Sequence, residues 1–109
     1  MFVSYENDEI RECCLLLRPG SVNSSFSTDE IKEIRAIIAD LKAAPKLVDT
    51  PLDYSRQNNF LTFQYSTFKI ICKITSIYEN PLDNQIERIM IVKIINKGLQ
   101  QDLTKQENI

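Results

Sequence analysis

The chain has 109 residues, which suit one domain and are too few for two separate cores. Hydrophobic residues make up 43% and charged residues 26%, the balance of a folded globular protein rather than a disordered chain. The low content of Gly and Pro excludes a collagen-like polymer, and no apolar run reaches the roughly 18 residues of a membrane span. The first nine residues turn acidic at once and lack the pattern of a secretory signal, so we expect a cytoplasmic protein.

Cysteine usage argues against disulfides and metals. The three cysteines are odd in number and two of them are adjacent, which disfavours a disulfide framework. There is no His, so a zinc site would need all three cysteines and a carboxylate, without a Cys-x-x-Cys spacing. We therefore expect neither a metal nor another cofactor, and interpret Cys13, Cys14 and Cys72 as small buried hydrophobic residues.

Charge is distributed unevenly along the chain. The net charge of −2 and the pI near 5.1 are not typical of a nucleic-acid-binding protein. However, residues 1–53 carry six basic against ten acidic side chains, whereas residues 54–98 carry six basic against three acidic ones. The basic half fits either ordinary solvated lysines on a sheet or a surface that binds anions.

The N-terminal residues predict a strand followed by a helix. Phe2 to Tyr5 form a short strand candidate. Asn7 is typical of a helix cap, with acidic residues in the first turn where they favour the positive end of the helix dipole. Pro19 and Gly20 end this helix, and a polar loop follows to residue 27.

A second helix is predicted with the clearest signals in the chain. Ser27 and Glu30 have the spacing of a capping box, and Pro45 ends the helix. Its apolar face repeats every three or four residues, at Ile31, Ile34, Ile37, Ile38 and Leu41. Residues 46–59 are expected to form an irregular connection.

From residue 60 the pattern changes to the period of two that is typical of strands. Three strands are predicted, over 60–66, 68–78 and 86–96. The alternation predicts five facing apolar pairs: Phe63 with Ile70, Leu61 with Cys72, Ile70 with Ile94, Cys72 with Val92, and Ile74 with Met90. The opposite face then holds Lys69, Lys73, Lys93 and Lys97.

These elements predict an α+β fold, in which an antiparallel β-sheet is packed on one face by two N-terminal α-helices. We expect residues 1–98 to form this single domain. Residues 99–109 are rich in Gln and polar, and are expected to form a C-terminal tail.

Three stretches resemble the RelE/ParE toxin superfamily, in particular its HigB-like "system killer" members. Residues 37–49 are similar to the end of a toxin helix that finishes with Leu, small residues and Pro before it runs towards the sheet. The Phe-Lys-Ile-Ile of residues 68–71 resembles the aromatic–basic–aliphatic strand of those toxins, and residues 91–95 resemble the last core strand. The chain departs from the family at residues 96–98, where HigB-like members commonly have Asp-Tyr-His or a similar polar cluster.

The resemblance implies the toxin of a type II toxin–antitoxin system, held by a small cognate antitoxin. In many members the toxin is an mRNA interferase, a ribonuclease that cleaves messenger RNA on the ribosome, which makes mRNA and the ribosome candidate partners here. The alternative is a non-catalytic binding module of the same fold, either a degenerate toxin or a ParE-like inhibitor that acts by protein docking. Neither hypothesis needs a membrane or a small-molecule cofactor.

Cleavage of RNA by attack of its 2′-hydroxyl needs a base, an acid for the leaving oxygen and positive charge on the phosphate. Without His, the base would be a carboxylate, a tyrosine or a lysine whose pKa neighbouring lysines have lowered.

Seven residues are candidates for this chemistry. The resemblance implies two catalytic residues, Lys69 in the strand motif and Arg56 in a loop where members often have a basic residue. Strand parity places further lysines beside Lys69, and a tyrosine ring can stack a base, so the candidate RNA-binding residues are Lys93, Lys97, Lys73, Tyr65 and Tyr54. For each, the alternative is an ordinary solvent-facing or rim position.

Overall fold

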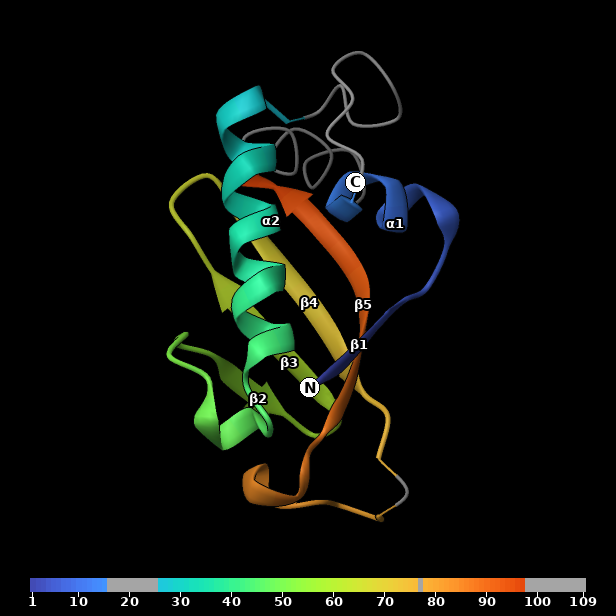
Figure 1. Ribbon diagram of the computed structural model, residues 1–109. Coiled ribbons are helices and arrows are strands. Elements are labelled where there is room, and N and C mark those ends of the chain that lie inside the picture. The colour runs from blue at the N-terminus through green and yellow to red at the C-terminus, as the bar shows by residue number, and fades with distance from the viewer. Residues whose placement is uncertain (16–25, 77, 98–109) are drawn as a thin grey trace, which may run out of the picture.

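The computed structural model shows a five-stranded sheet with two helices on one of its faces (Figure 1). It describes residues 1–15, 26–76 and 78–97. In chain order the elements are β1 (Phe2–Tyr5), α1 (Asp8–Leu15), α2 (Thr28–Ala43), the 3₁₀ turn η1 (Leu47–Asp49), β2 (Ser55–Gln57), β3 (Phe60–Gln64), β4 (Phe68–Ile74), the 3₁₀ turn η2 (Asp83–Gln85) and β5 (Arg88–Asn96). The fold is therefore α+β, as predicted. The expected tail over 99–109 and the expected end of the first helix lie outside the described residues.

The sheet is mixed rather than antiparallel, which corrects the prediction. The strand order is β1-β5-β4-β3-β2, and β1 runs parallel to β5 while the other neighbours are antiparallel. Parallel neighbours need a long crossover between them, and here it consists of both helices and the three strands β2 to β4. An alternating sequence pattern carries no information on strand direction, so the sequence could not distinguish the two arrangements.

Both helices begin at the predicted caps. The backbone N–H of Ile10 donates to Oδ1 of Asn7 at 2.9 Å. At the start of α2, Ser27 Oγ accepts from the N–H of Glu30 at 3.1 Å, and Glu30 Oε1 accepts from the N–H of Ser27 at 2.9 Å, so the capping box is confirmed. In the described ranges, neither helix has the length and apolar character needed to cross a bilayer.

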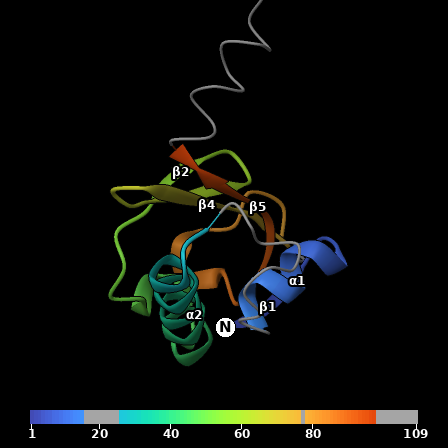
Figure 2. The same ribbon diagram turned by 90° about the horizontal axis from the view of Figure 1, so that it is seen from above.

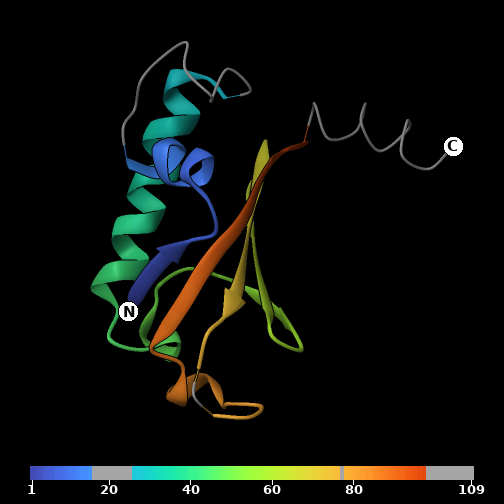
Figure 3. The same ribbon diagram turned by 90° about the vertical axis from the view of Figure 1, so that its right-hand side faces the viewer.

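The core lies between α2 and one face of the sheet (Figures 2 and 3). The five apolar residues predicted for α2 are all buried. All of them except Ile31 belong to one core cluster with buried strand residues that include Leu61, Phe63, Ile70, Ile89 and Ile91. Cys14 and Cys72 are buried in this core, as predicted, whereas the side chain of Cys13 lies outside the description.

The predicted register is correct for both pairs between β3 and β4, but for only one of the three pairs between β4 and β5. Phe63 faces Ile70, Leu61 faces Cys72, and Ile70 faces Ile94. Beyond that point a β-bulge shifts the register, so Cys72 faces Ile91 instead of Val92, and Ile74 faces Ile89 instead of Met90. Residues 89–92 are all apolar, so burying either alternate set satisfies the pattern equally well.

The connection predicted to be irregular contains the short strand β2. It forms a hairpin with β3, in which Gln57 faces Phe60 and the turn is Asn58-Asn59. Asn58 has a positive φ of 56°, a conformation that Asn adopts more readily than most residues. The prediction missed β2 because its sequence, Ser-Arg-Gln, has no apolar alternation.

The packing of α2 predicts the effect of a charge in its buried face. Ile38 is 2% exposed, whereas its neighbour Ala39 faces solvent. An unpaired buried carboxylate costs several kcal/mol, a large part of the roughly 5–15 kcal/mol that stabilises a domain. We expect Ile38→Asp to abolish cooperative thermal unfolding followed by circular dichroism, and Ala39→Asp to unfold close to the wild-type temperature. A cooperative Ile38→Asp transition near that of the wild type would contradict this packing.

Candidate functional site

The face of the sheet that points away from the helices has no element covering it within the described part of the chain (Figure 3). We call it the outer face. Because directly paired residues share a face, its members follow from the register. They are Phe2 and Ser4 of β1, Arg88, Met90, Lys93 and Ile95 of β5, Lys69, Ile71 and Lys73 of β4, Phe60, Thr62 and Gln64 of β3, and Ser55 and Gln57 of β2.

The outer face is cationic. Lys69, Lys73, Arg88 and Lys93 project from its strands, and none of the five strands contains Asp or Glu. Lys73 and Lys93 are exposed, whereas Lys69 is half-buried. Within the described part of the chain, the ion pair that forms joins Arg56 to Asp83. No carboxylate of that part is therefore paired with a lysine of the outer face. Cations of one sign on an uncovered surface create a positive potential that attracts anions.

The predicted lysines come together as strand parity indicated. Lys93 sits opposite Ile71, two residues along β4 from Lys69 and from Lys73. Lys97 lies just beyond β5 at the end of the outer face, where its N–H donates to the carbonyl of Thr67 at 2.8 Å and its ammonium donates to the carbonyl of Tyr65. The ammonium of Lys97 is therefore engaged by backbone, in contrast to those of Lys73 and Lys93.

Arg56 lies on the other side of the sheet, away from Lys69. It is paired with the buried Leu61, so its side chain projects towards the helix-covered side. There Nη1 donates to Oδ1 of Asp83 at 2.9 Å, and Nε donates to the carbonyl of Asn58 at 3.1 Å. The structure thus does not bring the two expected catalytic residues together. Only the folding of the connection before β5 places Asp83 beside Arg56, and no sequence pattern indicated that contact.

Both candidate tyrosines are also occupied within the fold. The hydroxyl of Tyr54 donates to Oδ2 of Asp83 at 2.6 Å, and its ring lies 6.0 Å from that of Phe63. Burial, with the hydrogen bond to Asp83, raises the pKa of Tyr54 to about 12. The ring of Tyr65 stacks on Phe68 at 5.0 Å, and burial raises its pKa as well. Neither phenol is poised to act as a base at neutral pH.

The described outer face offers positive charge without an acid–base pair. Its ionisable strand residues are lysines and one arginine. Cys72 lies under the sheet in the core, where burial raises the pKa of its thiol to about 12, which keeps it protonated. Lysine and arginine side chains can bind phosphates, but RNA cleavage also requires a general base and a general acid to transfer protons.

Two other kinds of site receive little support. Within the described ranges, no group of three or more Cys, Asp or Glu side chains is placed to hold a metal ion. A shallow hollow of about 220 Å³ lies at the β2 edge, lined by Asp53, Tyr54, Ser55, Thr62 and Gln64. Its carboxylate, Asp53, borders the outer face at that edge. The hollow is smaller than the roughly 300–1,000 Å³ of typical ligand pockets.

Strand alternation alone does not place Arg88 and Met90 on the outer face, and Met90 was predicted to face Ile74 on the apolar side. Arg88 would point to the helix side in a regular strand, and the bulge between Lys93 and Ile91 turns it outward. Phe60 alternates with the buried Leu61, so the predicted register already turns it away from the core, and both Phe60 and Phe2 are exposed. Phe60 follows Gln57 across the missed hairpin turn, so recognising β2 would have placed it at a strand end.

Comparison of the chain with family models, with curated proteins and with solved structures finds no match.

The pairing of Asp83 predicts an acid-sensitive contribution to stability. The hydrogen bond from Tyr54, followed by the contact with Arg56, holds the pKa of Asp83 below its ordinary value of 3.8. A lowered folded-state pKa contributes stability that is present above that ordinary value and is lost as pH falls through the folded-state value. We expect Asp83→Asn to lower the urea midpoint at pH 7, and the difference from wild type to shrink in acid below about pH 4.

The exposed Asp49 provides the matched control, since Asp49→Asn keeps the Tyr54–Asp83–Arg56 contacts. Parallel stability profiles for the wild type and Asp83→Asn between pH 7 and 3 would show that Asp83 does not contribute in this way.

Proposed function

We propose that this protein binds single-stranded RNA through the outer face, as the RNA-contacting surface of a RelE/ParE-like toxin or of a binding module derived from one. The observation that carries the proposal is the uncovered sheet face with Lys69, Lys73, Arg88 and Lys93 and no acidic strand residue. RNA phosphates supply negative charge at regular intervals, so an extended strand can meet several of these cations at once.

The lysines are spaced for contacts to successive phosphates. Residues two apart along a strand are separated by roughly 6.6 Å, and neighbouring strands by about 4.8 Å. Lys69 and Lys73 therefore lie about 13 Å apart on β4, with Lys93 on the adjacent strand between them. Such contacts recognise the backbone rather than the sequence of the RNA.

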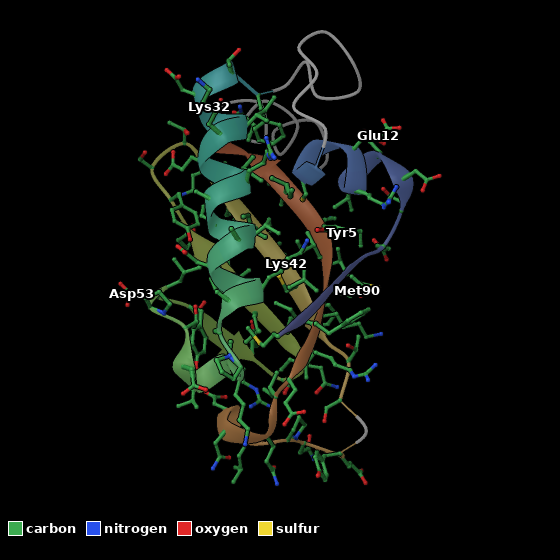
Figure 4. The ribbon with its side chains drawn as sticks, in the orientation of Figure 1. Tyr5, Glu12, Lys32, Lys42, Asp53 and Met90 are labelled. Atoms are coloured by element: carbon green, nitrogen blue, oxygen red, sulfur yellow. The ribbon has the colours of Figure 1, made fainter. Side chains whose placement is uncertain are left out.

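The acidic net charge does not oppose this proposal, because the strands carry no carboxylate, whereas the helices carry seven acidic against four basic residues. Figure 4 labels Glu12 on α1 and Met90 on β5, which lie on these two parts of the fold. The helix carboxylates are Asp8, Glu9, Glu12, Asp29, Glu30, Glu33 and Asp40. A molecule polarised in this way turns its basic side towards a polyanion as it approaches.

Between the two forms of the proposal, the geometry favours binding without cleavage. Arg56 is held by Asp83 and both tyrosines are packed in the fold, so Lys69 stands without the expected partners. An mRNA interferase would need its acid and base from elsewhere. In either form, a small antitoxin with an acidic segment would compete with RNA for the outer face.

Charge removal tests the surface directly. We expect the double variant Lys73→Gln/Lys93→Gln to weaken binding of a labelled single-stranded RNA in fluorescence anisotropy. It should also reduce the slope of log affinity against log salt by about 0.7 for each lysine that contacts a phosphate. Both side chains are exposed, so thermal stability should stay close to that of the wild type.

The matched control is Lys32→Gln/Lys46→Gln, which removes the same charge from α2, where Figure 4 labels Lys32, and from the connection that follows this helix. Its affinity and salt slope should equal those of the wild type. Equal losses in the two double variants would mean that net charge alone acts, and the outer face would no longer be supported as the binding surface.

Binding without cleavage makes a separate prediction. An end-labelled RNA mixed with the purified protein, alone or with translating ribosomes, should be retained in the complex and recovered at full length on a denaturing gel. Fragments that disappear in Lys69→Ala but persist in Lys46→Ala would contradict this form and support the interferase form instead.

A further inference from the structure

Two aromatic rings are exposed on the same face as the cations. Phe60 of β3 is 45% exposed and Phe2 of β1 is 62% exposed. The other large exposed hydrophobic residues, Val48, Tyr78 and Leu82, lie outside the strands. Among the described strands, therefore, large exposed apolar side chains occur on the outer face, where the cations are.

We propose that Phe60 is a stacking platform for an unpaired RNA base, with the Phe2–Arg88 pair as a second platform across the sheet. This inference rests on the function proposed above and adds how the RNA is held. Base stacking on an aromatic ring adds affinity that is tolerant of sequence, because every base has a π-face.

The position of Phe60 joins the ring to the charged surface. Phe60 is directly paired with Lys73, which is paired with Met90, which in turn is paired with Ser4. The side chains of a directly paired position have their Cβ atoms about 4.5–5.5 Å apart. The side chain of Lys73 thus starts beside the ring on the same face, from where its ammonium can reach the phosphate of a nucleotide whose base stacks on Phe60.

Phe2 and Arg88 are held together by a cation–π contact. They are paired in the parallel register, and the guanidinium carbon of Arg88 lies 5.4 Å from the centroid of the Phe2 ring. A guanidinium plane is itself a surface on which bases stack. Three strand spacings, about 14 Å, separate Phe60 on β3 from Ser4 on β1, the strand that also carries Phe2. The two platforms therefore lie on either side of β4 and β5, which carry the lysines.

This arrangement requires single-stranded rather than duplex RNA. In a duplex the bases are stacked on one another and cannot reach a ring on a sheet, whereas unpaired bases can be splayed onto it. The absence of strand carboxylates favours this polyanion over an apolar or basic partner for the face.

Binding of three probes tests the stacking. In fluorescence anisotropy, Phe60→Leu should weaken binding of a single-stranded RNA by about 5- to 100-fold. It should leave binding of inorganic polyphosphate, which has charge but no bases, and of duplex RNA unchanged. Phe60→Tyr keeps the ring and should restore the affinity for single-stranded RNA, while Val48→Ala removes an exposed apolar side chain elsewhere and should change nothing.

The chain has no Trp, so Phe60→Trp introduces a single indole at the platform, whose emission can be excited apart from that of the four tyrosines. Stacking predicts that single-stranded RNA quenches its emission and that polyphosphate does not. The stacking inference is overturned if Phe60→Leu binds RNA as tightly as the wild type, or if RNA does not change the emission of Phe60→Trp. Either result would leave binding through the lysines unaffected. If the wild-type protein binds neither RNA nor polyphosphate, the proposed function itself fails.

Discussion

Burial of the sheet on one side only is the constraint from which the other features of this molecule follow. Three of the four isoleucines of α2 share one core cluster with alternate residues of β3, β4 and β5, among them Phe63, Ile70 and Ile91. Because side chains alternate between faces, burying one set turns the other set outward. Lys69 and Lys73 are the neighbours of the buried Ile70 and Cys72, so a cationic outer face results directly from the packing of the core.

The β-bulge in β5 extends this surface to the edge of the sheet. Without it, Arg88 would lie on the helix side, where an unpaired guanidinium is costly. With it, Ile89 and Ile91 are buried and Arg88 emerges beside Phe2. The one extra residue of the bulge therefore buries the two isoleucines in the core and also brings Arg88, with its contact to Phe2, onto the outer face.

The basic residues of the second half divide into two classes by their partners. Arg56 is held by Asp83, which also accepts from Tyr54, and this cluster joins the β2 hairpin to the η2 turn. The three groups lie on the side of the sheet opposite to Lys69. Contacts within the fold thus explain why Arg56, Asp83 and Tyr54 are present. No hydrogen bond or ion pair within the described part of the chain explains Lys73 and Lys93 in the same way.

The elements that the sequence could predict are those with a local signal. The capping box of Ser27 and Glu30 and the apolar face of α2 need no tertiary information, and alternation sufficed to pair β3 with β4. The bulge lay within a continuous apolar run, and β2 is polar, so neither has a signature of that kind. The same limit applies to the site, since Lys73 and Lys93 follow from alternation but the place of Arg56 depends on the remote Asp83.

The most direct measurement of the central claim is a map of amide chemical-shift changes as single-stranded RNA is added to the isotopically labelled protein. The account predicts that the largest changes occur at the outer face, around Phe60, Ile71, Lys73 and Lys93, and that α2 is unaffected except where it contacts these strands. Changes centred on α1 and α2 with an undisturbed outer face would contradict it.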